Sequence, residues 1–185
     1  MSKEFHPARL DVRAFAEAGA TLSGTAPAAD FTRLAADLAP PIDAAHPAEV
    51  RWTATGQSRG GADGSAVPWL HLDAEALVPL ICQGCLTPVE TPLKVDRWFR
   101  FAADEATAAA EDEESDEDVL VESRDFNLPA LIEDELLMEI PITPRHDHCP
   151  VPTRLSVADP GFEDAEAARP NPFAVLGNLR PRKPE

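Results

Sequence analysis

The sequence predicts an α+β fold in which an antiparallel β-sheet, arranged as a meander or a partly closed barrel, is packed by one main helix at about residues 127–140. Three observations predict this fold. Apolar and polar residues alternate in consecutive stretches between residues 50 and 101, which is typical of half-buried strands. Short connections between such stretches favour antiparallel pairing with one solvated face. One later segment, 127–140, carries its apolar residues at helical spacing instead.

The N-terminal part is expected to contribute one strand and one short helix. Residues 8–15 alternate well enough for a strand, with Leu10 and Val12 on the same face. Asp30 is placed to cap a helix, because apolar residues recur at helical spacing after it until two prolines stop the pattern. These apolar residues are Phe31, Leu34 and Leu38.

The central sheet is expected from three further stretches. Val50, Trp52 and Ala54 alternate with polar residues, and a glycine-rich hairpin connection follows at 56–65. Residues 69–82 continue as an extended segment. After Cys85 the apolar residues fall on one parity, interrupted only by prolines of the kind found on edge strands. The residues on this parity are Val89, Leu93, Val95, Phe99 and Phe101.

The main helix is predicted from a cap and a stripe. Asn127 is a suitable N-cap, Pro129 is tolerated in the first turn and Pro141 ends the helix. The apolar stripe consists of Leu128, Leu131, Ile132, Leu136 and Ile140. Glu133, Asp134 and Glu139 are expected largely on the other side, and packing against the sheet is the expected role of the stripe. The adjacent carboxylates Glu133, Asp134 and Glu135 are expected to be solvated charges or ion-pair partners.

The remaining segments define the expected domain organisation. Residues 1–150 are predicted to form a single α+β domain that includes an acidic flexible insert at 104–124. Residues 104–118 contain nine acidic and no basic residues, which favours a disordered, solvated linker, although a docking surface for a basic protein stays open. Residues 151–185 are expected to be an extended tail with a short terminal helix at 171–179.

Composition restricts the function. The chain has 33 acidic residues against 16 lysines and arginines, and a net charge of −17. Such a charge repels phosphates at long range and attracts basic partners, so RNA binding would require a local basic patch. The N-terminus lacks an apolar signal region and no apolar run is long enough to span a membrane, so we expect a cytoplasmic protein with no membrane partner. No phosphate loop, Gly-x-Ser-x-Gly or His-Glu-x-x-His motif is present, so we expect no catalytic residues and no enzyme activity, DNA partner or small-molecule substrate.

The cysteines suggest a metal site. Cys82 and Cys85 are separated by Gln-Gly, which lets both sulfurs reach one ion. Cys149 and His148, with His146 as the alternative fourth ligand, complete a Cys₃His set suited to structural zinc. Two other interpretations remain open: a redox dithiol, disfavoured because a strand and not a helix follows the pair, and metal-free buried cysteines.

Three segments together resemble a known family. They are Cys82-Gln83-Gly84-Cys85-Leu86-Thr87-Pro88-Val89, the run Leu131–Pro141 leading to Pro144-Arg145-His146 and Cys149, and Asn171-Pro172-Phe173-Ala174-Val175-Leu176. Their order and spacing resemble the YceD family of large ribosomal RNA subunit accumulation proteins. The resemblance implies a role in the synthesis, processing or stability of 23S rRNA, without established catalytic residues. The chain departs from the family at Gly84, where a basic residue is usual, and in its acidic insert.

The partner is expected to be the 23S rRNA precursor, a large-subunit ribosomal protein, or both. An RNA contact would use Trp98 with its flanking arginines and the basic tail, since aromatic rings beside arginines can hold unpaired bases. The candidate contact residues are Arg97, Trp98, Arg100, Arg180, Arg182 and Lys183. Alternatively, Trp98 only covers the outer face of the sheet and contacts no RNA. The alternative function is an acidic chaperone for a basic ribosomal protein. Phe173 and Leu176 are candidates for docking to a partner or folding back on the sheet.

Overall fold

The computed structural model describes residues 4–61, 65–112, 115, 117–151 and 173. The chain divides into two compact units, Met1–Pro150 and Val151–Glu185. The fold described below is that of the first unit, and the predicted terminal helix at 171–179 lies outside the described residues apart from Phe173.

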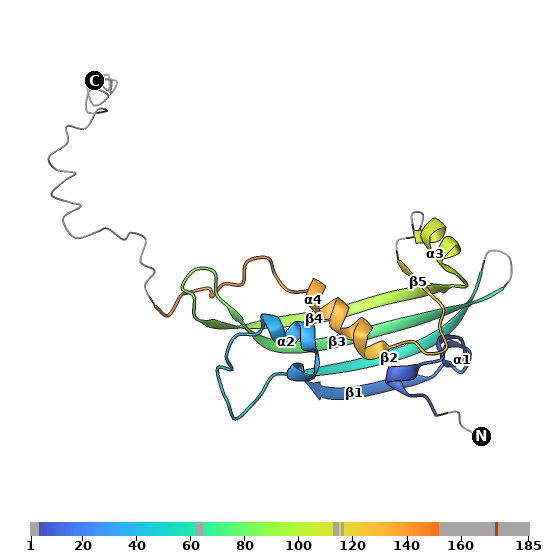
Figure 1. Cartoon of the computed structure of the whole chain (residues 1–185), viewed down its shortest axis with the longest axis horizontal. Helices are drawn as coiled ribbons and strands as arrows, with labels where there is room; N and C mark the ends of the chain where they lie inside the picture. Colours follow the sequence, from blue (N-terminus) through green and yellow to red (C-terminus); the bar gives the residue numbers. More distant parts are fainter. Residues whose placement is uncertain (1–3, 62–64, 113–114, 116, 152–172, 174–185) are drawn as a thin grey trace, which may run out of the picture. The chain divides into compact units, whose positions relative to one another are not determined.

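A five-stranded sheet with the order β1-β2-β3-β4-β5 forms the centre of the first unit (Figure 1). Its strands are β1 (Thr21–Pro27), β2 (Glu49–Gly60), β3 (Ala66–Ile81), β4 (Pro88–Ala102) and β5 (Asp118–Val121). β1 to β4 pair antiparallel as a meander, and β5 pairs parallel to β4. The predicted α+β class and the antiparallel meander are therefore confirmed, and the sheet is open, so the barrel alternative is not realised.

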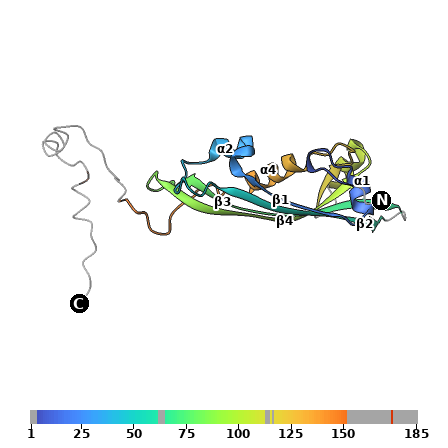
Figure 2. The same ribbon diagram turned by 90° about the horizontal axis from the view of Figure 1, so that it is seen from below.

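The helices of the first unit are α1 (Val12–Glu17), α2 (Thr32–Asp37), α3 (Glu105–Asp112) and α4 (Leu128–Met138), with single 3₁₀ turns at Pro7–Arg9 and Ala28–Asp30. Figure 2 shows α1, α2 and α4 above the same face of the strands. The opposite face of β2, β3 and β4 is not covered by these helices. Within the described residues, none of the helices has the length and apolar character needed to cross a bilayer.

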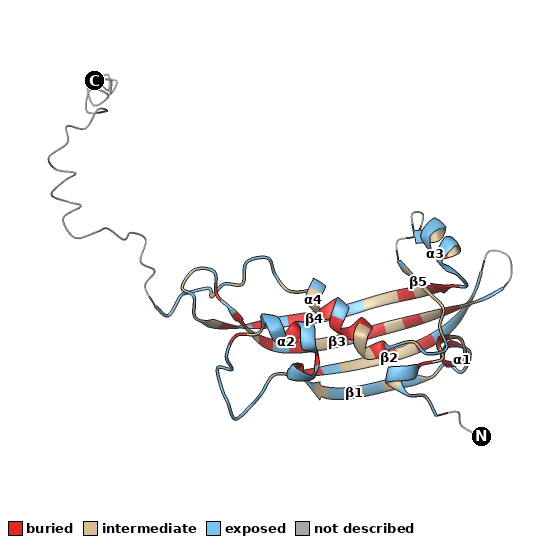
Figure 3. Cartoon of the chain, viewed as in Figure 1, coloured by how far each residue is buried: buried red, intermediate tan, exposed pale blue. Residues whose placement is uncertain are grey.

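The core lies between α4 and the covered face of the sheet. Alternate residues of β3 are buried, and so is the predicted apolar parity of β4, as the red segments of Figure 3 show. The main helix is also confirmed: Asn127 accepts a hydrogen bond from the Ala130 N–H at 3.2 Å, and Leu128, Ile132 and Leu136 are fully buried. The alternation of β4 and the stripe of α4 therefore face each other, as the sequence predicts.

The N-terminal prediction was wrong in two places. Residues 8–15 do not form a strand: the Asp11 side chain accepts a hydrogen bond from the Ala14 N–H at 3.1 Å and caps α1, because a short carboxylate before Val12 competes well with extended structure. Leu10 forms only an isolated bridge with Phe126. The edge strand β1, at Thr21–Pro27, was not predicted, since its half-buried parity of Leu22, Gly24 and Ala26 carries only one large apolar side chain.

The acidic insert is more ordered than predicted in its described part. Residues Glu105–Asp112 form α3, which Asp104 caps by accepting a hydrogen bond from the Thr107 N–H at 2.8 Å. Asp118–Val121 then form β5 on the edge of β4. The expectation of a linker without secondary structure therefore does not hold for these two segments, because a capped alanine-rich turn and an apolar Val-Leu-Val run lie inside the acidic composition.

Asp30 does not cap α2, because a side chain distant in the sequence takes that role. Glu133 of α4 accepts hydrogen bonds from the backbone N–H groups of Arg33 at 2.7 Å and Leu34 at 3.3 Å. It also forms an ion pair with the Arg33 guanidinium at 2.9 Å. Glu133 and Glu135 are buried, so Glu133 is not a solvated charge, whereas the predicted alternative of an ion-pair partner is confirmed for it. The carboxylate joins α2 to α4 at the N-terminal end of α2, where a negative charge is favoured.

Candidate metal centre

The tight turn between β3 and β4 places the first two cysteines. The Cys82 N–H donates to the Thr87 carbonyl at 3.0 Å, and the Leu86 N–H donates to the Cys82 carbonyl at 2.9 Å. Leu86 closes the turn with a positive φ of 61°, which a non-glycine residue adopts only where its surroundings hold it there. The Cys82 side chain is buried at the end of β3 and Cys85 is half-buried.

The segment that follows α4 brings the other two groups to this turn. The Gln83 N–H donates to the Pro144 carbonyl at 2.8 Å, which fixes the backbone of this segment beside the hairpin. The Cys82 and Cys149 sulfurs lie 3.9 Å apart, and the Cys85 sulfur lies 3.5 Å from His146 Nδ1. The fourth group in reach is therefore His146, the alternative named from the sequence, and His148 is not part of the cluster.

The four groups fit a tetrahedral metal site. One ligand atom from each of Cys82, Cys85, His146 and Cys149 can be chosen so that all lie within 4.8 Å of one another. A tetrahedral zinc bound at about 2.3 Å by sulfur and about 2.0 Å by nitrogen separates its ligand atoms by about 3.5–3.8 Å. The two pair distances given above are close to this range, so small adjustments of the side chains are enough for all four to hold one ion.

Gly84 allows the sulfurs to converge. A Cβ at this position would lie 3.2 Å from the Cys149 sulfur and 3.7 Å from the Cys82 sulfur. The Gly84 N–H also points toward the Cys82 sulfur at 3.4 Å. The glycine in this turn therefore leaves space beside the sulfur of the third cysteine.

Hydrogen bonds among the members of the cluster shift their pKa values in opposite directions. Hydrogen bonds from the Cys85 and His146 backbone lower the pKa of the Cys82 thiol to about 5. The hydrogen bond to Cys82 raises the pKa of His146, while that to Cys85 raises the pKa of Cys149 to about 11. The lowered pKa favours the thiolate form of Cys82, and the raised pKa favours protonation of His146. A metal ion would replace the shared protons, since thiolate and neutral imidazole are the binding forms.

Trp98, a candidate RNA contact, lies in an aromatic cluster on the uncovered face of the sheet. The His71 ring stacks on it with 4.6 Å between centroids. The Arg59 guanidinium lies 4.0 Å from the Trp98 ring centre and 4.2 Å from that of Trp69. An unpaired base would have to displace Arg59 or His71 to stack closely on Trp98. Sequence reasoning missed Arg59 and Trp69, which the registers of β2 with β3 and of β3 with β4 bring beside Trp98.

The two arginines that flank Trp98 are held by carboxylates. Arg100 pairs with Glu111 of α3 at 2.9 Å. Arg97 lies within 3.4–3.7 Å of Asp118, Glu135 and Glu139. Burial raises the pKa of Glu135, whose Oε2 has no hydrogen-bond partner among the described residues. Arg97 therefore compensates a buried carboxylate on the helix side of the sheet and does not share a face with Trp98 and Arg100.

Most candidate residues of the tail lie outside the part of the chain that the structure describes. Leu176, Arg180, Arg182 and Lys183 lie outside the described residues, and Phe173 is exposed within the second unit. The proposed fold-back of the tail and its RNA contacts therefore stay predictions.

Comparison with known proteins gives one family. The family model described as large ribosomal RNA subunit accumulation protein YceD matches residues 70–180. The curated protein of that name from Haemophilus influenzae is 32% identical over 111 residues, which is 56% of this chain and 60% of the relative. The chain thus matches less than two thirds of that relative's length. No solved structure matches the chain.

Proposed function

Because the chain belongs to the YceD family of large ribosomal RNA subunit accumulation proteins, we propose that it is a non-enzymatic cytoplasmic factor supporting the synthesis, processing or stability of 23S rRNA during large-subunit assembly. The family match carries this proposal. The matched residues, 70–180, include most of β3, all of β4 and α4, and all four members of the Cys/His cluster.

Binding, and not catalysis, is the mode of action that the site chemistry supports. Four protein groups meet in the Cys/His cluster, which is the closed arrangement of structural zinc, whereas catalytic zinc keeps one position for water or substrate. The two buried carboxylates of α4 are used internally: Glu133 binds Arg33, and Glu135 lies beside Arg97.

We assign Cys82, Cys85, His146 and Cys149 as the ligands of a structural zinc ion. In this role the ion joins the β3–β4 turn to the segment after α4, two regions about 60 residues apart in the sequence. A backbone hydrogen bond from the Gln83 N–H to the Pro144 carbonyl also connects the two regions. Zinc would supply the stability that a short segment without secondary structure lacks.

A second candidate function is escort of a basic ribosomal protein, with an indirect effect on the rRNA. The net charge of −17 favours it, because a protein of this charge attracts cationic partners and repels phosphate. The candidate RNA contact also favours escort over RNA binding, because the positive charges of Arg97 and Arg100 are already paired with carboxylates.

Co-sedimentation tests the proposed function. Tagged protein from exponentially growing bacteria is separated on a sucrose gradient, and precursor 23S rRNA is measured in each fraction. We expect the protein in fractions that contain immature large-subunit particles. Release of the protein by ribonuclease would support RNA contact, and retention of a basic ribosomal protein after ribonuclease would support escort. A protein found only at the top of the gradient and without a bound ribosomal protein would contradict both candidates.

A further inference from the structure

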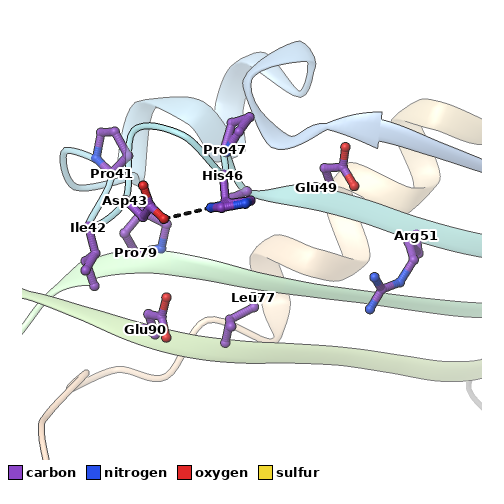
Figure 4. Close-up of a pocket in the computed structure, with 11 residues that line it drawn as sticks. Pro41, Ile42, Asp43, His46, Pro47, Glu49, Arg51, Leu77, Pro79 and Glu90 are labelled. Carbon is purple, nitrogen blue, oxygen red and sulfur yellow. Dashed lines mark hydrogen bonds and ion pairs between the residues drawn. The ribbon is translucent and has the colours of Figure 1, made fainter.

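Two adjoining hollows form a groove beside the ends of β3 and β4 that carry the metal centre. The first has a volume of about 380 Å³ and lies between the loop at 41–48, the start of β2, and Leu77, Pro79 and Glu90 (Figure 4). The second, of about 670 Å³, lies between Val89, Glu90, Pro92 and residues 145–148. Ile42 and Glu90 line both hollows. Each volume is within the range of about 300–1,000 Å³ typical of ligand sites.

Part of the wall of the first hollow is apolar. Ile42 is 55% exposed and Leu77 is 52% exposed, and three prolines at 41, 47 and 79 add to this surface. Leu77 and Pro79 belong to the parity of β3 that faces away from the core, as the burial of their neighbours Val78 and Leu80 shows. The loop is held beside β3 by the Ala39 N–H, which donates to the Pro79 carbonyl at 2.8 Å.

Carboxylates line the same hollow without enough positive charge to balance them. Asp43, Glu49 and Glu90 come from the loop, β2 and β4, as Figure 4 shows. Asp43 has His46 as its partner at 2.7 Å, and Arg51 is bound to Glu75 at 2.8 Å. Across the described part of the chain no arginine or lysine forms an ion pair with Glu49 or Glu90.

We propose that this groove binds an extended, arginine- and lysine-bearing segment of a protein partner. The aliphatic stem of such a side chain would lie along Leu77 and Ile42, while its cationic end reaches Glu49 or Glu90. A nucleic acid would place phosphates against these carboxylates and is therefore disfavoured. The proposal deepens the proposed function, on which it rests, by giving the chemistry of a partner.

The metal centre would hold one wall of this groove. His146 is at once a member of the Cys/His cluster and a residue lining the second hollow. The neighbouring residues Arg145 and Asp147 carry opposite charges, so this wall adds no net charge of its own. Fixing residues 145–148 at the β3–β4 turn therefore gives the groove its shape, and Asp43, Glu49 and Glu90 give it its charge.

Fluorescence anisotropy tests the proposal with the full chain and a short labelled peptide in which arginine and lysine alternate with leucine and glycine. We expect Glu90→Lys to weaken binding about tenfold, and Glu49→Lys to weaken it similarly. The matched control is Glu105→Lys on α3, which changes net charge equally at a distance from the groove (Figure 1) and should weaken binding less than about twofold. Leu77→Ala should also weaken binding, whereas Met138→Ala on exposed α4 surface should not.

Three results would overturn the proposal. They are equal weakening by Glu90→Lys and Glu105→Lys, no binding of the peptide to the wild-type chain, and tighter binding of a labelled single-stranded RNA than of the peptide. Circular dichroism confirms that each variant is folded, and Glu49→Lys replaces Glu90→Lys if the latter is not. If the peptide-binding test fails but the protein still co-sediments with immature large-subunit particles, the groove is not the binding site. The proposed role in 23S rRNA accumulation would then still stand.

Discussion

Cys85→Ser is expected to lose the bound zinc and to lower the free energy of unfolding by about 4 kcal/mol when free zinc exceeds its Kd about a thousandfold. Serine keeps the size of the side chain and its contact with Thr87, 3.2 Å away in the wild type, but it is a poor zinc ligand. The loss therefore reflects the metal and not a cavity. Elemental analysis and urea unfolding, each with and without a chelator, measure both effects.

The two histidines provide the matched comparison. His146→Ala should behave like Cys85→Ser, because His146 Nδ1 lies 3.5 Å from the Cys85 sulfur. His148→Ala should keep about one zinc per chain, because His148 is outside the cluster. A chelator should lower the stability of the wild type to that of Cys85→Ser. Equal stability of the wild type and Cys85→Ser at all zinc concentrations, with no zinc bound, would show that the cluster is metal-free.

Glu133→Ala is expected to lower the free energy of unfolding by about 3 kcal/mol. The buried carboxylate accepts two backbone hydrogen bonds at the start of α2 and pairs with Arg33, and each hydrogen bond to a charged group contributes about 1.5–3 kcal/mol. The matched control is Asp134→Ala, since Asp134 also pairs with Arg33 but is 52% exposed and should contribute less than about 1 kcal/mol. Chemical denaturation of both variants measures the difference.

The same carboxylate predicts a pH dependence. Burial alone would raise the pKa of Glu133, but the hydrogen bonds from Arg33 and Leu34 outweigh burial and lower it. A lowered pKa in the folded state stabilises the protein above the unfolded value of about 4.3, and this contribution is lost as the pH falls through the folded value. The gap in stability between wild type and Glu133→Gln should therefore be largest near neutral pH and shrink under acid. A gap independent of pH would contradict this.

Local sequence patterns were sufficient to predict those strands and helices in which the spacing of apolar residues marks the buried face. The parity of β4 and the stripe of α4 show which face is buried, because each face repeats at the period of its element. The cysteine pair also indicated half of the cluster, because two sulfurs in one turn must lie close together. Choosing between His146 and His148 required the path of the chain after α4, which the Gln83 to Pro144 hydrogen bond fixes.

Features that depend on contacts between distant segments were not predicted. Glu133 caps α2 from a position 100 residues away, and no local pattern distinguishes it from its exposed neighbour Asp134. Arg59 reaches Trp69 and Trp98 only through the registers of β2 with β3 and of β3 with β4. β5 runs parallel to β4 within an acidic segment whose composition alone favours a linker. In each of these cases the local structure depends on a tertiary contact that the local sequence does not indicate.

The level of mature 23S rRNA, relative to 16S rRNA, in a bacterial strain lacking its own YceD gene tests the account most directly. We expect the wild-type chain and His148→Ala to restore 23S rRNA, whereas Cys85→Ser and His146→Ala, which lose the metal, restore less. This result would connect the function to the Cys82, Cys85, His146 and Cys149 cluster. Failure of the wild-type chain to raise 23S rRNA, although it is expressed and folded, would contradict the account.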